Sequence, residues 1–196
     1  MTKLYCATGN AGKLREFRMA ALHAPVEIEF LDGYRQLPEC VEDGSTFEEN
    51  AIKKALHYGA HASEPLFADD SGLEVDALGG APGVYSARFS GPGATDESNN
   101  RLLLEKLRGV ANRTARFVCV IALVDGARVL GVYRGEVAGT IIDEARGTGG
   151  FGYDPFFFCP EFGCTFGEAT AEQKFTFSHR GRALRSMLAQ FPDPHR

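Results

Sequence analysis

Apolar residues recur along the chain at two different spacings. Where they recur every three or four positions the pattern predicts a helix, and where they alternate or run on it predicts a strand. The helix over residues 45–62 is the clearest, because Ser45 and Glu48 fit a capping box ahead of apolar positions at helical spacing. In chain order, the first half predicts a strand over residues 3–8, a helix over 13–22, a strand over 26–31, the helix over 45–62, a short strand over 66–68 and a helix over 96–107.

The second half of the chain predicts a long hairpin. Residues 116–124 are apolar on both alternating faces, which favours a central strand, and Asp125-Gly126 is a turn signal before a returning strand over residues 129–142. A last helix is expected after the N-cap residue Ser178, running to about residue 190. Because helices and strands alternate without a linker or an internal repeat, we expect a mixed α/β fold with one domain over residues 1–196.

Composition narrows the classes of function. Apolar residues make up 44% of the chain and the net charge is −5, so bulk electrostatics argue against a general nucleic-acid or membrane-surface binder. No apolar stretch reaches the roughly 18 residues of a membrane span, and the first residues lack the apolar run of a signal peptide. The five cysteines contain no C-x-x-C pair, so we expect reduced, packed thiols and a cytoplasmic protein.

An acidic protein that binds a polyanion must concentrate its cations locally, and the first candidate is the turn Thr8-Gly9-Asn10-Ala11-Gly12-Lys13. Here a predicted strand enters a glycine-containing turn that opens a helix. The helix N-terminus favours an anion, and Lys13 adds a full charge. The spacing differs from that of a Walker A loop. Spacing alone leaves two interpretations open, a phosphate cradle and an ordinary strand-to-helix turn.

Acidic residues gather at two places, the loop of Glu39, Glu42 and Asp43 and the pair Asp69-Asp70 at the predicted end of a strand. A Mg²⁺ ion that carries a triphosphate needs only one or two protein carboxylates. Because adjacent strand residues point to opposite faces, Asp69 and Asp70 should not both face one site. Solvated loop charge is the better explanation of Glu39 and Asp43.

Two lysines lie side by side in the predicted helix over residues 45–62. Glu49 and Lys53 have the i,i+4 spacing of a helix-surface ion pair, which explains Lys53 without a function. Lys54 is aligned with Asn50 and lacks such a partner. Lys54 is therefore the better candidate for a phosphate ligand, with surface solubility as the alternative.

The C-terminal third combines aromatic residues with fixed donors. Phe151-Gly152-Tyr153-Asp154 places two aromatic rings around a glycine and follows them with a carboxylate. Lys174 adds a donor, and His179 and Arg180 add two more at a predicted helix N-terminus. Aromatic faces with a few placed polar groups suit a nucleobase. Core packing remains the alternative for either aromatic ring.

Two further patterns do not carry a function. Residues 147–152 match G-x-G-x-x-G, but they lead into an aromatic strand, whereas a dinucleotide-binding fingerprint opens a helix. His57 and His61 have i,i+4 spacing without the glutamate of an H-E-x-x-H motif or an evident third ligand, so they are expected on a helix surface and not on zinc.

Six motifs follow one another in order along the chain. They are Thr8-x-Asn10-x-x-Lys13, Glu42-Asp43-Gly44-x-Thr46-Phe47-x-Glu49-Asn50-Ala51, Ala68-Asp69-Asp70-Ser71-Gly72-Leu73, Gly79-Gly80-Ala81-Pro82-Gly83-Val84-Tyr85-Ser86-Ala87-Arg88, Gly150-Phe151-Gly152-Tyr153-Asp154-Pro155 and Ser178-His179-Arg180-Gly181. Together they resemble the inosine triphosphate pyrophosphatase family, the HAM1-like proteins whose bacterial members are called non-standard purine NTP pyrophosphatases. The motifs extend from near residue 3 to near residue 191, so the resemblance covers nearly the whole chain.

This resemblance implies a homodimer with an elongated α/β fold: a mixed central sheet with flanking helices, two lobes and a cleft between them. It implies a Mg²⁺-dependent hydrolase that cleaves ITP, dITP and XTP to nucleoside monophosphate and pyrophosphate, and so removes deaminated purines from the nucleotide pool. Glu42 and Asp70 would hold Mg²⁺, and Asp70 would also be the general base. The substrate would contact Thr8, Gly9, Asn10, Ala11, Gly12, Lys13, Lys54, Ser71, Phe151, Gly152, Tyr153, Asp154, Lys174, His179 and Arg180.

Two other functions are open at this stage. One is a pyrophosphatase of another specificity, such as a house-cleaning enzyme for pyrimidine or methylated nucleotides. The other is a nucleotide-binding module without activity. Glu42 and Asp70 argue against the second, because a protein that only binds polyanions gains little from carboxylates without a metal.

Overall fold

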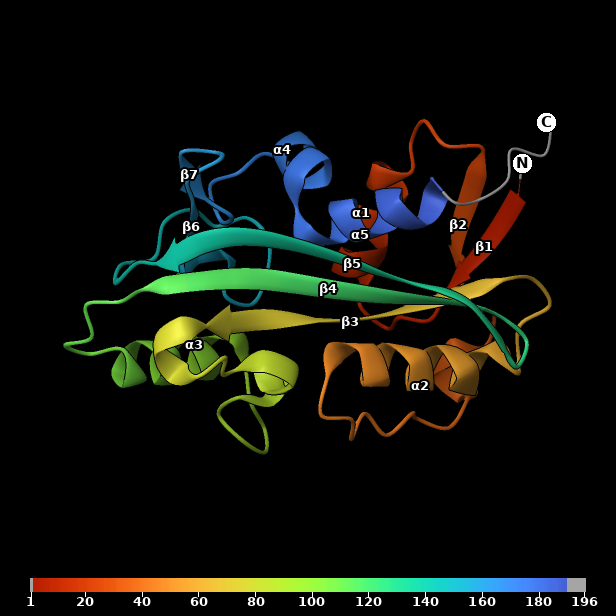
Figure 1. The fold of residues 1–196 in the computed structure, drawn as a ribbon, viewed down its shortest axis with the longest axis horizontal. Coiled ribbons are helices and arrows are strands. Elements are labelled where there is room, and N and C mark those ends of the chain that lie inside the picture. The colour runs from red at the N-terminus through yellow and green to blue at the C-terminus, as the bar shows by residue number, and fades with distance from the viewer. Residues whose placement is uncertain (1, 190–196) are drawn as a thin grey trace.

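The predicted hairpin forms the middle of a mixed sheet in the computed structural model, which describes residues 2–189 (Figure 1). Strands β4 (Thr114–Asp125) and β5 (Arg128–Ile141) pair antiparallel along the long axis of the molecule. Strand β3 (Leu66–Val75) pairs antiparallel with β4 over its full length. The seven strands follow the order β2-β1-β3-β4-β5-β6-β7, with β1 (Thr2–Cys6), β2 (Val26–Phe30), β6 (Phe157–Cys159) and β7 (Cys164–Thr165) at the two ends.

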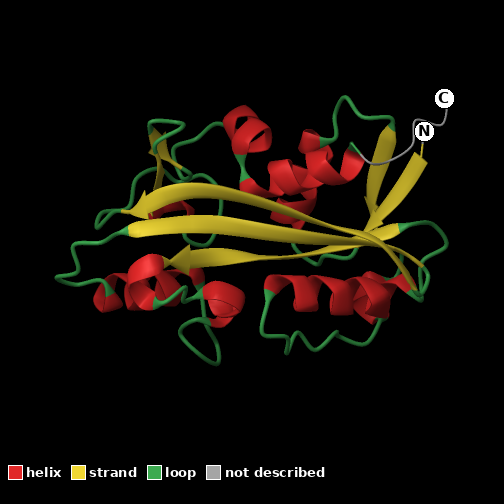
Figure 2. Cartoon of the chain, viewed as in Figure 1, coloured by secondary structure: helices red, strands yellow, loops and turns green. Residues whose placement is uncertain are grey.

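Helices cover both faces of the sheet (Figure 2). One face carries α2 (Phe47–Gly59) and α3 (Asp96–Lys106), and the other carries α1 (Ala11–Ala20), α4 (Ala171–Phe177) and α5 (His179–Leu188). The predicted α/β class, with a mixed sheet and flanking helices, is confirmed. None of the described helices combines the length and the apolar character needed to cross a bilayer.

The side chains of β3 alternate between two separate cores. Phe67 packs with Phe17 and Leu184 on the α1 and α5 face, whereas Leu66 and Ala68 pack with the apolar side of α2. This alternation is the period-2 pattern of a strand that is buried on both sides. The residues that follow Ala68 along β3 are therefore expected to face the two sides of the sheet in turn.

Strand β3 is much longer than its predicted range of residues 66–68. The sequence predicts that this strand ends in the polar residues Asp69 to Gly72, but the ladder with β4 runs on to Val75. The β4 backbone satisfies the hydrogen bonds of β3 at these positions, so long-range pairing overrides the local polar character. Asp69 and Asp70 consequently lie inside a strand and not at its end.

The predicted capping box of α2 does not form, and the N-cap lies one residue later than Ser45. Thr46 is the N-cap, with its hydroxyl accepting from the N–H of Glu49 at 3.1 Å, and Ser45 donates to the Glu49 carboxylate. At the other end of the chain Ser178 caps α5 as predicted, accepting from the N–H of Gly181 at 3.1 Å. The predicted end of this helix, near residue 190, lies outside the described residues.

Close packing of α5 on the sheet depends on a glycine in β5. A methyl group added at Gly135 would lie 2.2 Å from the carbonyl oxygen of His179 and 2.5 Å from the backbone nitrogen of Ala183. Both contacts are with helix backbone, which cannot move aside as a flexible side chain can. Gly135 therefore sets the distance between β5 and α5.

We expect Gly135→Ala to destabilise the protein by about 1–3 kcal/mol, because overpacking forces α5 away from the sheet. Thermal unfolding should show a decrease in Tm of roughly 2–4 °C for each kcal/mol in a chain of this size. Val129→Ala, at an exposed position of the same strand, serves as the control and should change stability by at most about 0.5 kcal/mol. Equal Tm values for the two variants would contradict the role of Gly135.

Candidate functional site

The candidate site lies where β1 ends and β3 continues. The parallel pairing of β1 with β3 is confined to Tyr5 with Leu66 and Cys6 with Phe67, whereas β4 accompanies the other edge of β3 to Val75. From Ala68 onward, no further β1 residue pairs with this edge of β3 within the described chain. Side chains from both faces of the sheet can therefore approach one another around Asp69 and Asp70.

A cavity of about 300 Å³ opens at this edge. It brings together residues from α1, α2, β3, α5 and the loop before β6. Thr8, Gly9, Ala11, Gly12 and Lys174 are the predicted contacts that do not line it. The predicted site residues that do line the cavity are Asn10, Lys13, Glu42, Lys54, Asp70, Ser71, Phe151, Gly152, Tyr153, Asp154, His179 and Arg180.

Asp70 faces α2 and is held there by an amide. The Nδ2 group of Asn50 donates to Asp70 Oδ2 at 3.0 Å, and Asn50 is itself buried. Burial raises the pKa of Asp70 to about 6, and the charge of Glu42 adds to this rise, although the bond from Asn50 and the charge of Lys54 oppose it. At neutral pH Asp70 is thus ionised and more basic than an ordinary aspartate.

Asp69 points to the opposite face, as the strand alternation predicts. Its Oδ2 atom accepts from Lys13 Nζ at 2.8 Å and from the Ser71 hydroxyl at 2.9 Å. Burial alone would raise its pKa, but the charges of Lys13, Lys54 and Arg180 outweigh this and lower the pKa to about 2. Asp69 is fully buried and does not line the cavity. It binds Lys13 and Ser71, which do line the cavity, and so holds them in position.

Lys54 is not the free lysine that the helix pattern suggested. It is largely buried, and its Nζ atom lies 2.9 Å from a carboxylate oxygen of Glu42. The expected pair of Glu49 with Lys53 is wrong, because Lys53 instead lies 2.5 Å from Asp43 on the surface. Both pairs form because the acidic loop folds against α2. The residue spacing within the helix does not indicate where this loop lies.

The start of α1 is already capped. The side chain of Asn10 accepts from the backbone N–H groups of Gly12 at 2.8 Å and Lys13 at 3.1 Å. The Thr8 hydroxyl accepts from the N–H of Asn10 at 3.1 Å and fixes the turn from inside. The turn is therefore well ordered by its own side chains, and it presents Asn10 and Lys13 to the cavity.

The aromatic end of the cavity rests on a buried ion pair. Lys174 Nζ lies 2.5 Å from Asp154 Oδ2, and the same oxygen accepts from the N–H of Phe151 at 3.1 Å. Burial raises the pKa of Asp154, although Lys174 opposes the rise. Asp154 lines the cavity and Lys174 does not, so Lys174 supports the loop through Asp154.

His179 and Arg180 enter the cavity from the first turn of α5. The His179 ring stacks on Phe117 at 4.9 Å, and neither ring nitrogen has a hydrogen-bond partner among residues 2–189. Burial and then the charge of Arg180 lower the pKa of His179 well below its usual value, so the ring is neutral and offers one donor and one acceptor. Arg180 pairs with Glu16 at 2.9 Å and lies over the Phe151 ring at 4.9 Å.

Sequence reasoning missed several residues of this region. Asn50 accepts from the N–H of Gly44 at 2.7 Å while it donates to Asp70, so it joins the acidic loop to β3. Its signal in the sequence is a polar residue on the apolar side of a helix. Arg88 donates to the carbonyl of Glu42 at 3.1 Å and closes the fourth motif of the resemblance. Other lining residues without a predicted role are Gly72, Val84, Ser86, Ala87, Asp96, Asn99 and Phe117.

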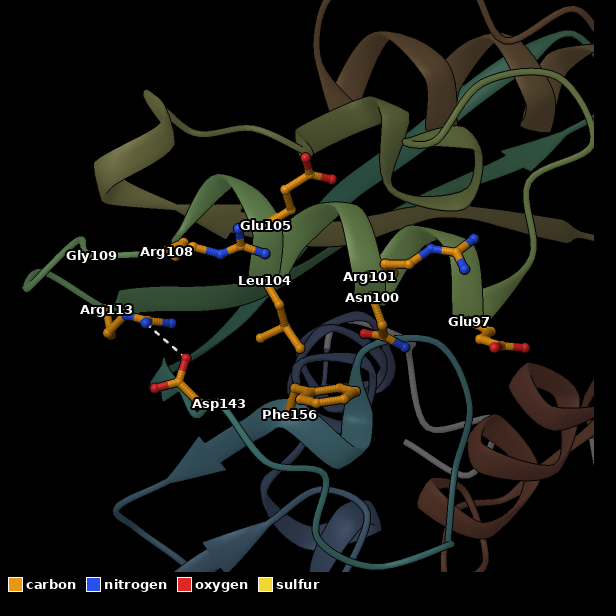
Figure 3. A pocket seen from close by; sticks show the side chains of 10 residues that line it. All are labelled: Glu97, Asn100, Arg101, Leu104, Glu105, Arg108, Gly109, Arg113, Asp143 and Phe156. Atoms are coloured by element: carbon orange, nitrogen blue, oxygen red, sulfur yellow. Dashed lines mark hydrogen bonds and ion pairs between the residues drawn. The ribbon is translucent and has the colours of Figure 1, made fainter.

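A larger hollow of about 870 Å³ lies along α3 and contains none of the predicted site residues (Figure 3). Its side chains mix charges of both signs, and Arg113 there pairs with Asp143 at 2.8 Å. Most of the predicted site residues instead line the smaller cavity at the edge of β3, which is therefore the candidate site.

The patterns set aside in the sequence have ordinary structural roles. Residues 147–152 lead through a 3₁₀ turn (Asp154–Phe156) into the strand β6, as the sequence predicts, and do not open a helix. His57 contacts the carbonyl of Pro38, and no group of three or more metal-ligating side chains occurs among the described residues. The five cysteines are free thiols, as predicted.

Comparisons with known proteins agree with the motifs. A model of the Ham1 family matches residues 4–190. Curated relatives include the dITP/XTP pyrophosphatases of Geobacter sulfurreducens, 51% identical over 94% of each chain, and of Exiguobacterium sp., 50% identical over 96% of each chain. Among solved structures, the HAM1 protein from Coxiella burnetii aligns with a TM-score of 0.86 and 38% identity over 96% of this chain and 98% of that one.

The Staphylococcus aureus Ham1 protein aligns similarly, with a TM-score of 0.84 and 38% identity over 96% of this chain and 97% of that one. The matched family model extends over both the α1 turn and the α5 residues that the cavity brings together. Motif order, fold and full-length similarity thus lead to one conclusion: the chain belongs to the Ham1 family.

Proposed function

We propose that this chain hydrolyses non-standard purine nucleoside triphosphates, namely dITP, ITP and XTP, to nucleoside monophosphate and pyrophosphate. The observation that carries the proposal is that one cavity is lined by both charged and aromatic side chains, which we call its charged half and its aromatic half. The charged half holds Lys13, Lys54, Glu42 and Asp70, and the aromatic half holds Phe151 with its neighbours. The names of the curated relatives, dITP/XTP pyrophosphatase, support the same substrates.

The triphosphate would lie in the charged half. Lys13 and Lys54 are each held by a buried or half-buried carboxylate, so both ammonium groups are fixed before the substrate arrives. Such fixed cations stabilise the charge that develops on a leaving pyrophosphate without a large reorganisation. The capped start of α1 adds the positive end of the helix dipole beside Lys13.

The two acids of this half fit a divalent cation. Glu42 and Asp70 line the same cavity, and the Glu42 charge adds to the rise in the Asp70 pKa, so two like charges are close together. Two oxygen-donating carboxylates are what Mg²⁺ takes from a protein when phosphates and water supply its other ligands. We propose that Glu42 and Asp70 hold Mg²⁺. Bound there, the ion would neutralise charge on the phosphates.

Asp70 would also act as the general base. We propose that its carboxylate takes a proton from the water that attacks the α-phosphorus, while the bond from the α-phosphorus to the bridging oxygen breaks. Pyrophosphate then leaves with that oxygen. Without the metal, burial raises the pKa of Asp70 to about 6, so the carboxylate is ionised at neutral pH. Asn50 keeps the carboxylate oriented.

Selectivity would come from the neutral His179 and from Arg180. Their side chains carry polar atoms without partners, namely both ring nitrogens of His179 and the Nε group of Arg180. Donors aimed at a 6-oxo group are satisfied by hypoxanthine or xanthine, whereas the amino group of adenine leaves them unpaired. A mismatch of this kind can discriminate by roughly 10⁴-fold.

The wider setting follows from the same chemistry. We propose a cytoplasmic homodimer, folded as one domain with two lobes about the cavity, that acts on free nucleotides and not on nucleic acid. An enzyme of this kind would keep deaminated purines out of DNA and RNA. Analytical ultracentrifugation would test the dimer directly.

The substrate preference is tested with a panel of about ten nucleoside triphosphates and a pyrophosphate-release assay. We expect kcat/KM for dITP, ITP and XTP to exceed that for ATP and GTP by orders of magnitude. Adenine has an amino group in place of the 6-oxo group that would face His179 and Arg180. Guanine has the 6-oxo group but also carries a 2-amino group, which hypoxanthine and xanthine lack. Comparable turnover of ATP, or a preference for a pyrimidine nucleotide, would contradict the proposed specificity.

Lys13→Ala removes a charge-assisted phosphate contact and should lower kcat/KM about 10- to 100-fold. The same change leaves the buried Asp69 carboxylate unpaired, which costs stability as well. The double variant Lys13→Ala with Asp69→Asn is the control, because it removes both charges. We expect the double variant to regain Tm without regaining activity. Wild-type activity in the double variant would mean that the turn is only structural.

Asp70→Asn and Asp69→Asn separate the two adjacent acids. Asp70→Asn keeps the size of the side chain but removes its basicity and its charge, so chemistry should nearly stop while part of the nucleotide affinity survives. Asp69→Asn weakens the contacts that hold Lys13 and Ser71 in position. A milder loss of activity and of stability is therefore expected.

The measurements for both variants are kcat, dITP affinity and the dependence of activity on Mg²⁺ concentration. An inactive Asp69→Asn beside a nearly wild-type Asp70→Asn would reverse the assignment of the base. Full activity in both variants would place the metal site and the base elsewhere in the chain.

A further inference from the structure

The loop that forms the aromatic end of the cavity is held from α3 at a single residue. The N–H of Gly152 donates to Asp96 Oδ2 at 2.7 Å, and the carbonyl of Gly152 accepts from Asn100 Nδ2 at 2.9 Å. Asp96 and Asn100 are four residues apart and lie on one side of α3. The two side chains therefore grip both polar backbone groups of Gly152 from a rigid helix.

External support at Gly152 bears on both aromatic residues of this loop. Its φ of +62° lies in the left-handed region, which other residues rarely adopt, and the aromatic residues Phe151 and Tyr153 flank it. Rotation at this glycine would move both rings. The helix that grips it is itself well fixed, because Thr95 and Ser98 form a capping box at the start of α3.

The position of Phe151 depends on this grip. Its ring lies under the guanidinium of Arg180 at 4.9 Å, and a methyl group added at Gly12 would reach the ring at 3.4 Å. Phe151 thus connects the turn before α1 with the donors of α5. A small shift of Gly152 would change the distance between the aromatic wall and the groups proposed to recognise the base.

Asn100 holds Gly152 but does not line the nucleotide cavity. It is buried, it lines the separate hollow along α3, and its Oδ1 atom has no partner in the described chain (Figure 3). Among the described residues, the donation to Gly152 is the one hydrogen bond that the Asn100 side chain makes. Asp96, by contrast, is exposed and also lines the nucleotide cavity. Any effect of Asn100 on the substrate must therefore pass through the loop.

We propose that Asn100 and Asp96 are a positioning pair that sets the purine selectivity of this chain by fixing Gly152, and with it Phe151 and Tyr153. The proposal rests on the proposed function, since it concerns the same cavity. It assigns selectivity partly to α3, on the opposite face of the sheet from the His179-Arg180 pair. Loss of the grip is expected to affect recognition of the base and to spare the triphosphate half.

The test compares Asn100→Ala and Asp96→Ala with wild type. For each protein, kcat/KM is measured for dITP and for dATP, and the inhibition constant is measured for inorganic tripolyphosphate, which carries no base. We expect the ratio of kcat/KM for dITP over dATP to fall about 10-fold in both variants, the effect of one lost hydrogen bond to a partly buried backbone group. Tripolyphosphate affinity should stay within about twofold of wild type.

Two further variants separate positioning from general damage. Asp96→Asn keeps an oxygen that can accept from Gly152 and should retain the selectivity ratio. Glu97→Gln changes the neighbouring exposed acid, which has no hydrogen bond or ion pair within the described chain, and should behave as wild type. Because Asp96 is exposed, its alanine variant is expected to fold even where loss of Asn100 lowers the Tm, and comparison with Asp96→Asn shows whether its effect passes through the hydrogen bond to Gly152.

An unchanged selectivity ratio in the folded alanine variants would overturn the proposal. So would a parallel loss of tripolyphosphate and dITP affinity, because that pattern indicates a general disturbance of the cavity. Failure of the proposed function looks different: wild type would then bind dITP in a calorimetric titration without releasing pyrophosphate. In that case the ratio of dITP to tripolyphosphate affinity would still report on the grip of Asn100 and Asp96.

Discussion

The antiparallel ladder between β3 and β4 is the constraint on which the site depends. It keeps β3 extended through a polar stretch after β1 has ended. From Ala68 onward one edge of β3 therefore has no neighbouring strand, apart from a single bridge of Glu74 with Pro82, while the other edge is fully paired. Along this stretch the strand's alternation sends Asp69 toward α1 and α5, and Asp70 toward α2. Both helical layers thereby contribute to one cavity at the open edge.

Charge compensation makes this arrangement compatible with burial. Buried ions are tolerated when each is paired and hydrogen-bonded, and the cavity follows this rule with Lys13 on Asp69, Lys54 on Glu42, Lys174 on Asp154 and Arg180 on Glu16. Burial dominates for Asp70, which faces an amide, so its pKa rises where that of its neighbour falls. Two chemically identical residues thus acquire different properties from opposite faces of one strand.

At the aromatic end of the cavity, too, the lining residues are held in position by contacts with neighbouring residues. Asp154, held by Lys174, orders the backbone at Phe151, and α3 grips Gly152 through two side chains. His179 is fixed by stacking on Phe117, a residue of β4. The groups that face the cavity are therefore positioned by contacts with other elements of the fold, which is how a rigid, selective pocket is built.

The sequence by itself determined the α/β class, the central hairpin, the cap of α5 and the opposite directions of Asp69 and Asp70, because these follow from local periodicity and capping chemistry. Its ordered motifs also indicated the family. Only the tertiary structure decided that β3 continues to Val75, that Lys54 pairs with Glu42, and that Asn50 and Asn100 carry supporting roles. Each of these depends on a contact between segments distant in the chain, and long-range pairing leaves no mark in the spacing of residues along it.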